Sequence, residues 1–209
     1  AQRTEEVTFL TGTDEHGEKI EQMARAEGRD VREFVTEVAT AFETTWREMG
    51  IDFDVFYRTT SPEHVRRVQH ALAVLKDRGE IVFREYEGKY CVGCERFLTD
   101  SELVEGKCPD HLRAPELRKE ANYFFLMSKY RDAIAEHFEK NADAIQPPHY
   151  RNEILSFLKQ PLGDLCISRP TSRLTWGIPL PFDPGFVTYV WFDALLNYLC
   201  ATGWPENFD

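Results

Sequence analysis

The chain contains 209 residues, of which 42% are hydrophobic and 29% are charged. These proportions are typical of a globular protein with one large domain or two small ones. Asp and Glu number 36 and Lys and Arg number 25, which gives a net charge of −11. A generally basic surface for nucleic acid is therefore excluded, because the overall negative field repels phosphate and leaves room only for local RNA contacts. No apolar run reaches about 18 residues, so we expect no transmembrane helix and no membrane partner.

The five cysteines are too few, and odd in number, for the disulfide framework of a secreted protein. Cys91, Cys94 and Cys108 are clustered, whereas Cys166 and Cys200 stand alone in apolar surroundings. We therefore expect a reducing, cytoplasmic location, in which the clustered thiols indicate a bound metal.

The first half of the chain alternates β-prone and helical segments. Gly28, Gly50 and Gly79 each follow an amphipathic segment, and Asp30 and Ser61 are good N-caps. Apolar spacing predicts, in chain order, a strand over 7–11, helices over 18–27 and 31–49, a strand over 51–57 and a helix over 62–78. A strand, a polar turn and a pair of helices in this order are typical of an α/β fold.

The second half has shorter elements. Ile81–Phe83 and Lys89–Cys91 flank Glu87-Gly88, which predicts a hairpin turn. Beyond the cysteines the pattern predicts helices over 129–141 and 150–159, a strand over 165–169, a loop over 170–184, a strand over 187–191, and a helix over 194–201 capped by Asp193.

Three cysteines and a histidine have the spacing of a zinc site. Cys91-x2-Cys94 and Cys108-x2-His111 are separated by thirteen residues, and each pair can place two ligands on one tight turn. Four protein ligands leave no position for a reactive water, so we expect structural zinc whose removal unfolds residues 85–120. Two alternatives remain open: ordinary buried thiols beside a surface histidine, or a catalytic zinc that His111 does not bind.

The turn Thr13–Gly17 is expected where the first strand ends and a helix begins. Ligands of open α/β sheets bind at the carboxyl ends of the strands, and a carboxylate such as that of Asp14 suits an ammonium or a ribose hydroxyl better than a phosphate. The alternative is that Asp14 or Thr13 caps the helix and His16 only packs, because capping residues are common at this position.

Six segments stand out in chain order: Phe9–Gly17 (FLTGTDEHG), Glu87–Cys91 with the zinc cluster, Asn122–Phe125, Ile167–Arg169, Trp176–Pro179 and Tyr189–Ala194 (YVWFDA). Together they resemble the methionyl-tRNA synthetases, a family of class I aminoacyl-tRNA synthetases. The single cluster of three cysteines and one histidine is similar to the bacterial type with one pair of zinc knuckles. The resemblance extends over nearly the whole chain, although the TDEHG turn alone does not separate this family from other class I synthetases.

The resemblance implies a Rossmann-type parallel sheet interrupted by a zinc-binding α+β connective-peptide insertion. The catalytic domain would comprise residues 1–75 and 187–209, and the insertion would comprise residues 76–186 with zinc knuckles at 91–111. The implied reaction is the activation of methionine with ATP and Mg²⁺ to methionyl-adenylate, followed by transfer to tRNA(Met).

The same resemblance implies roles for single residues. Asp14 would receive the α-ammonium group of methionine. The thioether pocket would be lined by Trp191, Ala194, Leu195 and Tyr198, and activation would need Arg169. The spacing agrees, because residues three to seven positions after a strand-ending Trp191 fall on one face of the next helix. The alternatives are core packing for Trp191 and Tyr198 and a structural ion pair for Arg169.

Two motifs of class I synthetases do not occur in the sequence: the histidine-rich HIGH-type motif and the lysine-bearing KMSKS-type loop. Because these groups stabilise charge on the ATP phosphates, we expect the 209 residues to be an interior portion that does not form methionyl-adenylate alone. Leu195 also stands where some relatives have proline. The sequence does not indicate the oligomeric state.

Two other functions remain open. The chain could belong to a class I synthetase for valine, isoleucine, leucine or cysteine, but the thioether-lining residues and the single zinc cluster favour methionine. A non-catalytic, zinc-stabilised interaction module would account for the cysteines and would leave the acidic turn and the YVWFDA segment unexplained. Methionine binding that is lost on Asp14→Ala or Trp191→Ala would decide against the module.

Overall fold

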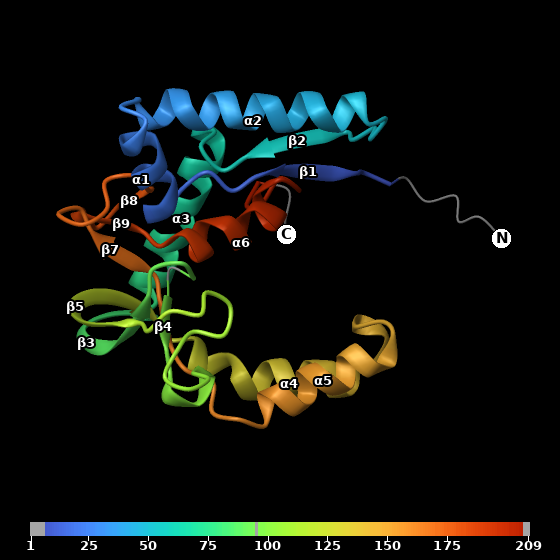
Figure 1. Cartoon of the computed structure of the whole chain (residues 1–209). Helices are drawn as coiled ribbons and strands as arrows, with labels where there is room; N and C mark the ends of the chain where they lie inside the picture. Colours follow the sequence, from blue (N-terminus) through green and yellow to red (C-terminus); the bar gives the residue numbers. More distant parts are fainter. Residues whose placement is uncertain (1–6, 95, 207–209) are drawn as a thin grey trace.

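The computed structural model describes residues 7–94 and 96–206, so the outermost residues of the two expected catalytic segments lie outside the described part (Figure 1). Within these ranges the chain has a mixed α/β fold, with parallel strands in one part and antiparallel sheets in the others. The predicted fold class is thereby confirmed. Among the described residues, none of the helices combines the length and the hydropathy needed to cross a bilayer.

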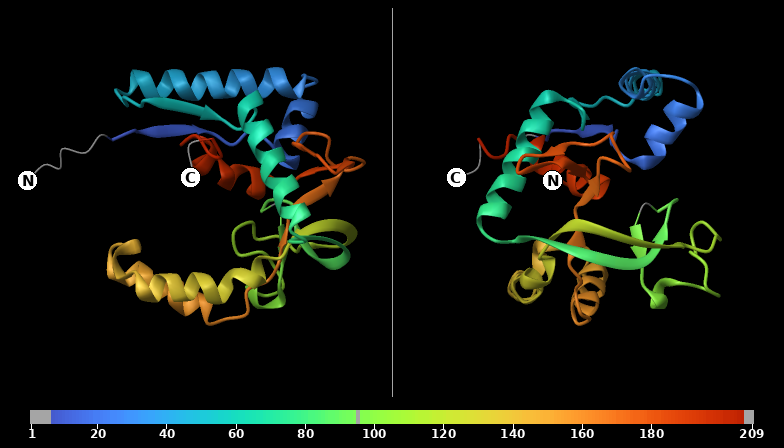
Figure 2. Two further views of the ribbon diagram at one scale, coloured as in Figure 1. Left: turned by 180° about the vertical axis from the view of Figure 1, so that it is seen from behind. Right: turned by 90° about the vertical axis from the view of Figure 1, so that its left-hand side faces the viewer.

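The N-terminal part forms a small α/β layer. Its elements are β1 (Leu10–Thr13), α1 (Glu18–Ala26), α2 (Val31–Glu48), β2 (Val55–Arg58) and α3 (Pro62–Asp77), completed by α6 (Val190–Cys200) from the end of the chain. β1 and β2 pair in parallel, from Leu10 opposite Val55 to Thr13 opposite Arg58. α2 lies along one side of these strands and α6 along the other (Figures 1 and 2).

The ends of these helices follow the predicted local signals. Asp30 accepts hydrogen bonds from two backbone N–H groups in the first turn of α2, at 2.9 and 3.1 Å, and Ser61 accepts one in α3 at 3.2 Å. Gly28, Gly50 and Gly79 follow the three helices with φ values of 66°, 75° and 68°, a backbone conformation that glycine adopts without a steric penalty.

The middle of the chain forms an antiparallel sheet beside a pair of helices. Its elements are β3 (Ile81–Cys91), β4 (Arg96–Leu98), β5 (Glu116–Phe125), α4 (Arg131–Lys140), α5 (Pro148–Leu158) and β6 (Leu165–Cys166), with 3₁₀ turns at Asp100–Glu102, Met127–Tyr130 and Ala142–Ala144. The strand order is β4-β3-β5-β6. α4 and α5 occupy the two predicted helical segments and lie side by side (Figures 1 and 2).

The predicted hairpin at Glu87-Gly88 is wrong. β3 continues through both residues, and Gly88 lies opposite Arg118 of β5. The ladder between these strands runs from Ile81 opposite Phe125 to Tyr90 opposite Glu116. The tertiary pairing decides the conformation here, because a long ladder outweighs the turn preference of one dipeptide.

A third sheet leads back to the α/β layer. It contains β7 (Ser168–Pro170), β9 (Asp183–Thr188) and β8 (Pro179–Leu180), in the order β7-β9-β8. The ladder of β9 ends where Thr188 lies opposite Ser168, and α6 begins at Val190. Trp191 and Asp193 therefore lie inside the first turns of a helix, so the prediction that Trp191 ends a strand and that Asp193 caps the helix is wrong.

Two apolar clusters hold these parts together. The first joins α3, β3 and α6 through Val68, Leu72, Ile81, Ile167, Ile178, Leu180 and Phe192. The second joins α1 and α2 to the returning segment through Ala24, Phe34, Val35, Leu174, Trp176 and Val187. Because each cluster combines residues from distant parts of the sequence, their burial fixes the acidic turn, the cysteine-bearing sheet and α6 relative to one another.

Candidate functional site

The acidic turn Thr13–Gly17 connects β1 to α1. Gly17 is the N-cap of α1, with φ 123°, and no side-chain hydrogen bond from the described residues caps this helix. The alternative in which Asp14 or Thr13 caps the helix is therefore wrong. Thr13 donates its hydroxyl to Glu15 at 2.6 Å instead, and Asp14 remains exposed to solvent.

Glu15 anchors the turn and is only 3% exposed. Its carboxylate accepts hydrogen bonds from the Arg58 guanidinium at 2.6 and 2.8 Å, and from the hydroxyls of Thr13 at 2.6 Å and Thr60 at 2.5 Å. Burial acts to raise the pKa of Glu15, but these hydrogen bonds outweigh it and lower the pKa below its ordinary value. The ionised Glu15 thus fixes the backbone from which Asp14 projects.

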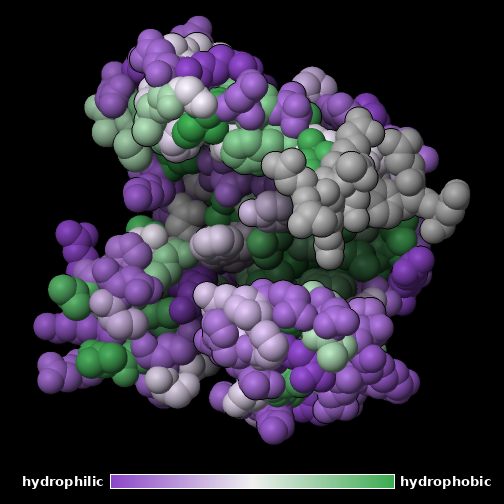
Figure 3. Space-filling model, turned by 90° about the vertical axis from the view of Figure 1, so that its right-hand side faces the viewer, coloured by the Kyte–Doolittle hydropathy of each residue, from purple (hydrophilic) through white to green (hydrophobic). Residues whose placement is uncertain are grey.

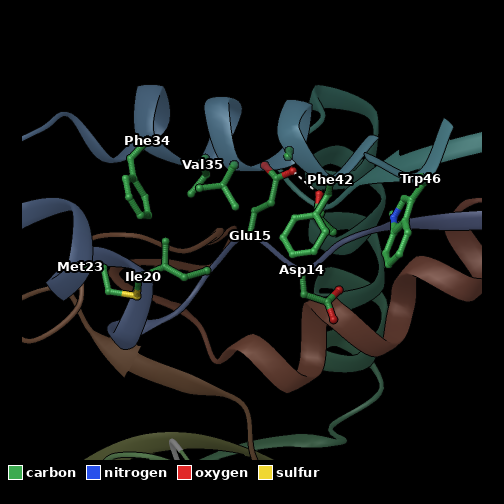
Figure 4. Close-up of a pocket in the computed structure, with 12 residues that line it drawn as sticks. Asp14, Glu15, Ile20, Met23, Phe34, Val35, Phe42 and Trp46 are labelled. Atoms are coloured by element: carbon green, nitrogen blue, oxygen red, sulfur yellow. Dashed lines mark hydrogen bonds between the residues drawn. The ribbon is translucent and has the colours of Figure 1, made fainter. Parts of the chain in front are cut away.

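Asp14 lies where three cavities meet. The first cavity, of about 380 Å³, lies between the end of β1, α1 and α2. Its walls are mostly apolar and include Ile20, Met23, Phe34, Val35, Val38, Ala39, Phe42 and Trp46. Figure 4 shows Asp14 pointing away from the side chains of α2 and toward α6, whereas Glu15 points toward α2.

The other two cavities lie between the acidic turn and α6. One, of about 240 Å³, runs along β1 and is lined by Asp14, Asn197 and Tyr198. The other, of about 220 Å³, is lined by Asp14, Trp191 and Ala194. Asp14 therefore shares one cavity with the indole and the neighbouring cavity with the phenol.

The predicted thioether-lining residues all belong to α6. Their positions, 191, 194, 195 and 198, recur with helical spacing and fall on one side of the helix. Trp191 and Ala194 line the cavity shared with Asp14, and Tyr198 lines the adjacent one. Leu195 is 59% exposed and lines none of these three cavities.

The environment of Asp14 favours its protonated form more than water does. Asp14 keeps contact with solvent, but the protein around its carboxylate displaces enough water to raise its pKa, and the neighbouring carboxylate of Glu15 raises it further. Asn197 opposes this effect, since its Nδ2 donates to Oδ1 of Asp14 at 3.4 Å. A cationic partner in the cavity would stabilise the ionised carboxylate, as an ammonium group does.

His16 and Asp193 form a buried contact between the acidic turn and α6. Nδ1 of His16 lies 2.6 Å from Oδ2 of Asp193, and the two side chains are 6% and 1% exposed. The His16 ring also packs against Trp176, with ring centroids 5.4 Å apart. His16 thus packs, as one interpretation expected, and in addition links the acidic turn to α6.

Arg169 is 2% exposed and lies behind the start of α6. Its guanidinium lies 4.2 Å from the ring centroid of Tyr189, the N-cap of α6, and Nη1 donates to the carbonyl oxygen of Ser168 at 2.7 Å. Arg169 lines none of the three cavities at Asp14. It touches the cavity-lining helix through Tyr189.

The cysteine cluster is brought together as the spacing predicted. One ligand atom from each of Cys91, Cys94, Cys108 and His111 lies within 4.8 Å of the others. Nδ1 of His111 is 3.3 to 3.8 Å from the three sulfurs, and the sulfurs of Cys94 and Cys108 are 3.4 Å apart. A tetrahedral zinc ion needs sulfur–sulfur and sulfur–nitrogen edges of about 3.8 and 3.5 Å. These four residues can therefore hold one metal ion.

Gly93 supports the same conclusion. A Cβ added at this position would lie 2.2 Å from Cδ2 and 2.5 Å from Nε2 of His111. The knuckle therefore requires glycine, because only a residue without a side chain lets the imidazole lie this close to the turn while Nδ1 faces the sulfurs.

The metal cluster and the cavity at Asp14 adjoin one another. Gly93 and Cys94 line the same cavity as Asp14 and Trp191. On the other side of Gly93, a cleft of about 500 Å³ separates the knuckle from α1 and is lined by Lys19 and Arg113. Figure 3 shows the molecule hollowed between α2, above, and the α4–α5 pair, below, with hydrophobic residues deep in the hollow.

The family described as "tRNA synthetases class I (M)" matches residues 1–114 and 111–208. The chain therefore belongs to the class I tRNA synthetases. Among curated proteins it is similar to the methionine–tRNA ligase of Deinococcus radiodurans, with 52% identity over 202 residues, and to that of Clostridium perfringens, with 48% identity over 203 residues. These alignments cover 93% and 97% of this chain, but the chain spans only 29% and 31% of the relatives' lengths.

A solved structure has a similar fold. The methionyl-tRNA synthetase of Mycobacterium tuberculosis, crystallised with methionyl-adenylate, is 37% identical to this chain and superimposes with a TM-score of 0.87. The match covers 98% of this chain and 41% of the other. The predicted resemblance to the methionyl-tRNA synthetases is confirmed.

Sequence reasoning missed several residues of this region. Glu15 was not assigned a role, and its partner Arg58 is 43 positions away. Asn197 could have been found, because it lies between Ala194 and Tyr198 on the helix whose neighbouring positions were predicted to line the site. Gly93 carried a local signal as well, since knuckle turns favour glycine between paired ligands.

Proposed function

We propose that this chain is the amino-acid-binding and metal-binding portion of an enzyme that activates methionine with ATP to methionyl-adenylate and transfers it to tRNA(Met). The observation that carries the proposal is the cavity in which Asp14 faces Trp191 and Ala194. The proposal is also supported by the family membership of the chain and by its similarity to a synthetase crystallised with methionyl-adenylate.

The cavity provides complementary groups for both ends of methionine. The carboxylate of Asp14 binds the α-ammonium group through a charge-assisted hydrogen bond. Trp191 and Ala194 pack on the thioether, which is apolar and polarizable and suits an aromatic wall, and Tyr198 approaches from the adjacent cavity. Leu195 lines neither cavity and has no contact with methionine in this proposal. The methionine carboxylate is then left free to attack the α-phosphorus of ATP, which enters with Mg²⁺, and pyrophosphate leaves.

Arg169 serves the activation step indirectly in this proposal. Its guanidinium packs on Tyr189, the residue that starts α6, and so supports the helix that carries Trp191. The division into a catalytic domain (1–75 and 187–209) and an insertion (76–186) is likewise proposed, with the second apolar cluster joining the two parts.

We propose that the metal is structural Zn²⁺, bound by Cys91, Cys94, Cys108 and His111. The ion would supply no chemistry to the reaction and would stabilise the turn whose residues Gly93 and Cys94 form a wall of the cavity. Its thiolate ligands must stay reduced, which suits the cytoplasm.

Calorimetric titration of the full-length protein with methionine, valine, isoleucine, leucine and cysteine tests the proposal. We expect methionine to bind most tightly and Asp14→Ala and Trp191→Ala to abolish that preference. Preference for another amino acid would indicate a different class I synthetase, and no binding of any of them would favour the interaction module. Methionine-dependent ATP–pyrophosphate exchange should require the full-length protein and be absent from the 209 residues alone.

A further inference from the structure

We propose that His16 and Asp193 form a positioning pair that holds the acidic turn against α6 and thereby sets the distance from Asp14 to Trp191. The inference rests on the proposed function, because it gives the pair a role in methionine binding. It adds to the site two residues that act on the substrate through their neighbours.

The pair is a buried link between segments 177 positions apart in the sequence. With exposed fractions of 6% and 1%, neither side chain can exchange its partner for water. The second oxygen of Asp193, Oδ1, is buried with no hydrogen-bond partner among the described residues. All of the hydrogen bonding seen at the Asp193 carboxylate is therefore directed at His16, and loss of the contact leaves a buried charge unpaired.

Both members of the pair are flanked by residues of the proposed site. Asp14 precedes His16 by two positions, and Trp191 and Ala194 lie on either side of Asp193 in α6. Asp14, His16, Trp191 and Ala194 all line the same cavity, whereas Asp193 does not. A shift of the buried contact therefore changes the separation between the carboxylate that binds ammonium and the indole that packs on the thioether.

A weaker link on the same side of α6 depends on this pair. Asn197 lies four positions after Asp193, one helical turn further on, so both side chains face the acidic turn. Its hydrogen bond to Asp14 is exposed and long, at 3.4 Å. Asn197 can orient Asp14 only while the buried pair holds α6 in place.

The geometry distinguishes two substitutions of His16. A carboxylate only accepts hydrogen bonds, so Nδ1 of His16 must carry a hydrogen and donate it in the hydrogen bond to Asp193. The amide nitrogen of asparagine occupies nearly the place of Nδ1, whereas that of glutamine occupies the place of Nε2. His16→Asn therefore keeps a donor for Asp193, and His16→Gln does not.

The test measures Kd values by calorimetry on the full-length protein for methionine and for 4-(methylthio)butanoate, which lacks the ammonium group. The ratio of the two Kd values reports how well Asp14 is placed. We expect His16→Gln and Asp193→Leu, which removes the acceptor at nearly constant size, to weaken methionine binding about tenfold and to leave the analogue within about twofold. His16→Asn should keep the wild-type ratio, as should the matched control His149→Gln, an exposed histidine of α5.

Wild-type ratios in folded His16→Gln and Asp193→Leu proteins would overturn the positioning role. So would an equal loss of methionine and analogue binding in both His16 variants, because that result describes general packing. If a thermal melt shows that His16→Gln is unfolded, Asp193→Leu, which accepts no hydrogen bond, decides alone. A wild-type protein that binds methionine no better than the analogue would remove the proposed function itself, and this inference with it.

Discussion

Replacing Gly93 with alanine should expel His111 from the metal cluster while leaving all four ligands in the sequence. The new Cβ would lie 2.2 Å from Cδ2 of the imidazole, and ordinary contact begins at 3.4 Å, so the ring would have to move by about 1.2 Å. Zinc–ligand bonds tolerate errors of only about 0.2 Å. We therefore expect the His111–zinc bond to break and the affinity for zinc to fall at least about 100-fold, more than the usual loss from a perturbed supporting residue.

Competition with a chromogenic chelator measures this affinity, and the metal content of the purified protein provides a second readout. Gly163→Ala is the matched control, because a Cβ at Gly163 meets nothing within 4 Å. Unchanged zinc affinity in Gly93→Ala would refute the assignment of His111 as the fourth ligand. Equal losses in both variants would show that the effect is not specific to the knuckle.

Three further outcomes follow from the site. Asp14→Asn should raise the Kd for methionine at least about tenfold. It should also increase the free energy of unfolding at pH 7, because the raised folded-state pKa makes ionised Asp14 unfavourable; urea titration should show that this gain disappears below the ordinary value of 3.8. Glu15→Gln should lower the free energy of unfolding by about 2 kcal/mol in the same assay. Because folding lowers the pKa of Glu15, this loss of stability relative to wild type should shrink as the pH falls below 4.5. Removing the metal with a chelator should speed amide hydrogen exchange in residues 85–120 and change the near-UV circular dichroism; unaltered spectra would argue against a structural metal.

The parts of the fold that depend on local interactions could be predicted from the sequence. Asp30 and Ser61 cap the helices they were expected to cap, because a cap involves only the first turn. The extended conformation of Glu87-Gly88 could not be predicted from local sequence, because it depends on pairing with β5, which is distant in the chain. The start of α6 before Trp191 was missed for a similar reason: β-branched residues there favour a strand, but the ladder of β9 ends at Thr188.

The same distinction applies to the site. The metal cluster was predictable because each pair of ligands occupies one short turn. The pairing of His16 with Asp193, and that of Glu15 with Arg58, depends on where the clusters of buried side chains bring distant segments together. The roles of Asp14, Trp191 and Arg169 came from a family resemblance and remain predictions until the substitutions are measured.

The unbroken course of β3 has a mechanical consequence. Ile81 begins the strand inside the first apolar cluster, and Cys91, the first metal ligand, ends it. The long ladder with β5 makes β3 rigid along its length. Gly93 lies two residues after the end of the strand and lines the cavity at Asp14. We therefore expect a substitution that shifts β3 within the first apolar cluster to move Gly93 as well, and so to change the width of the cavity without touching its lining.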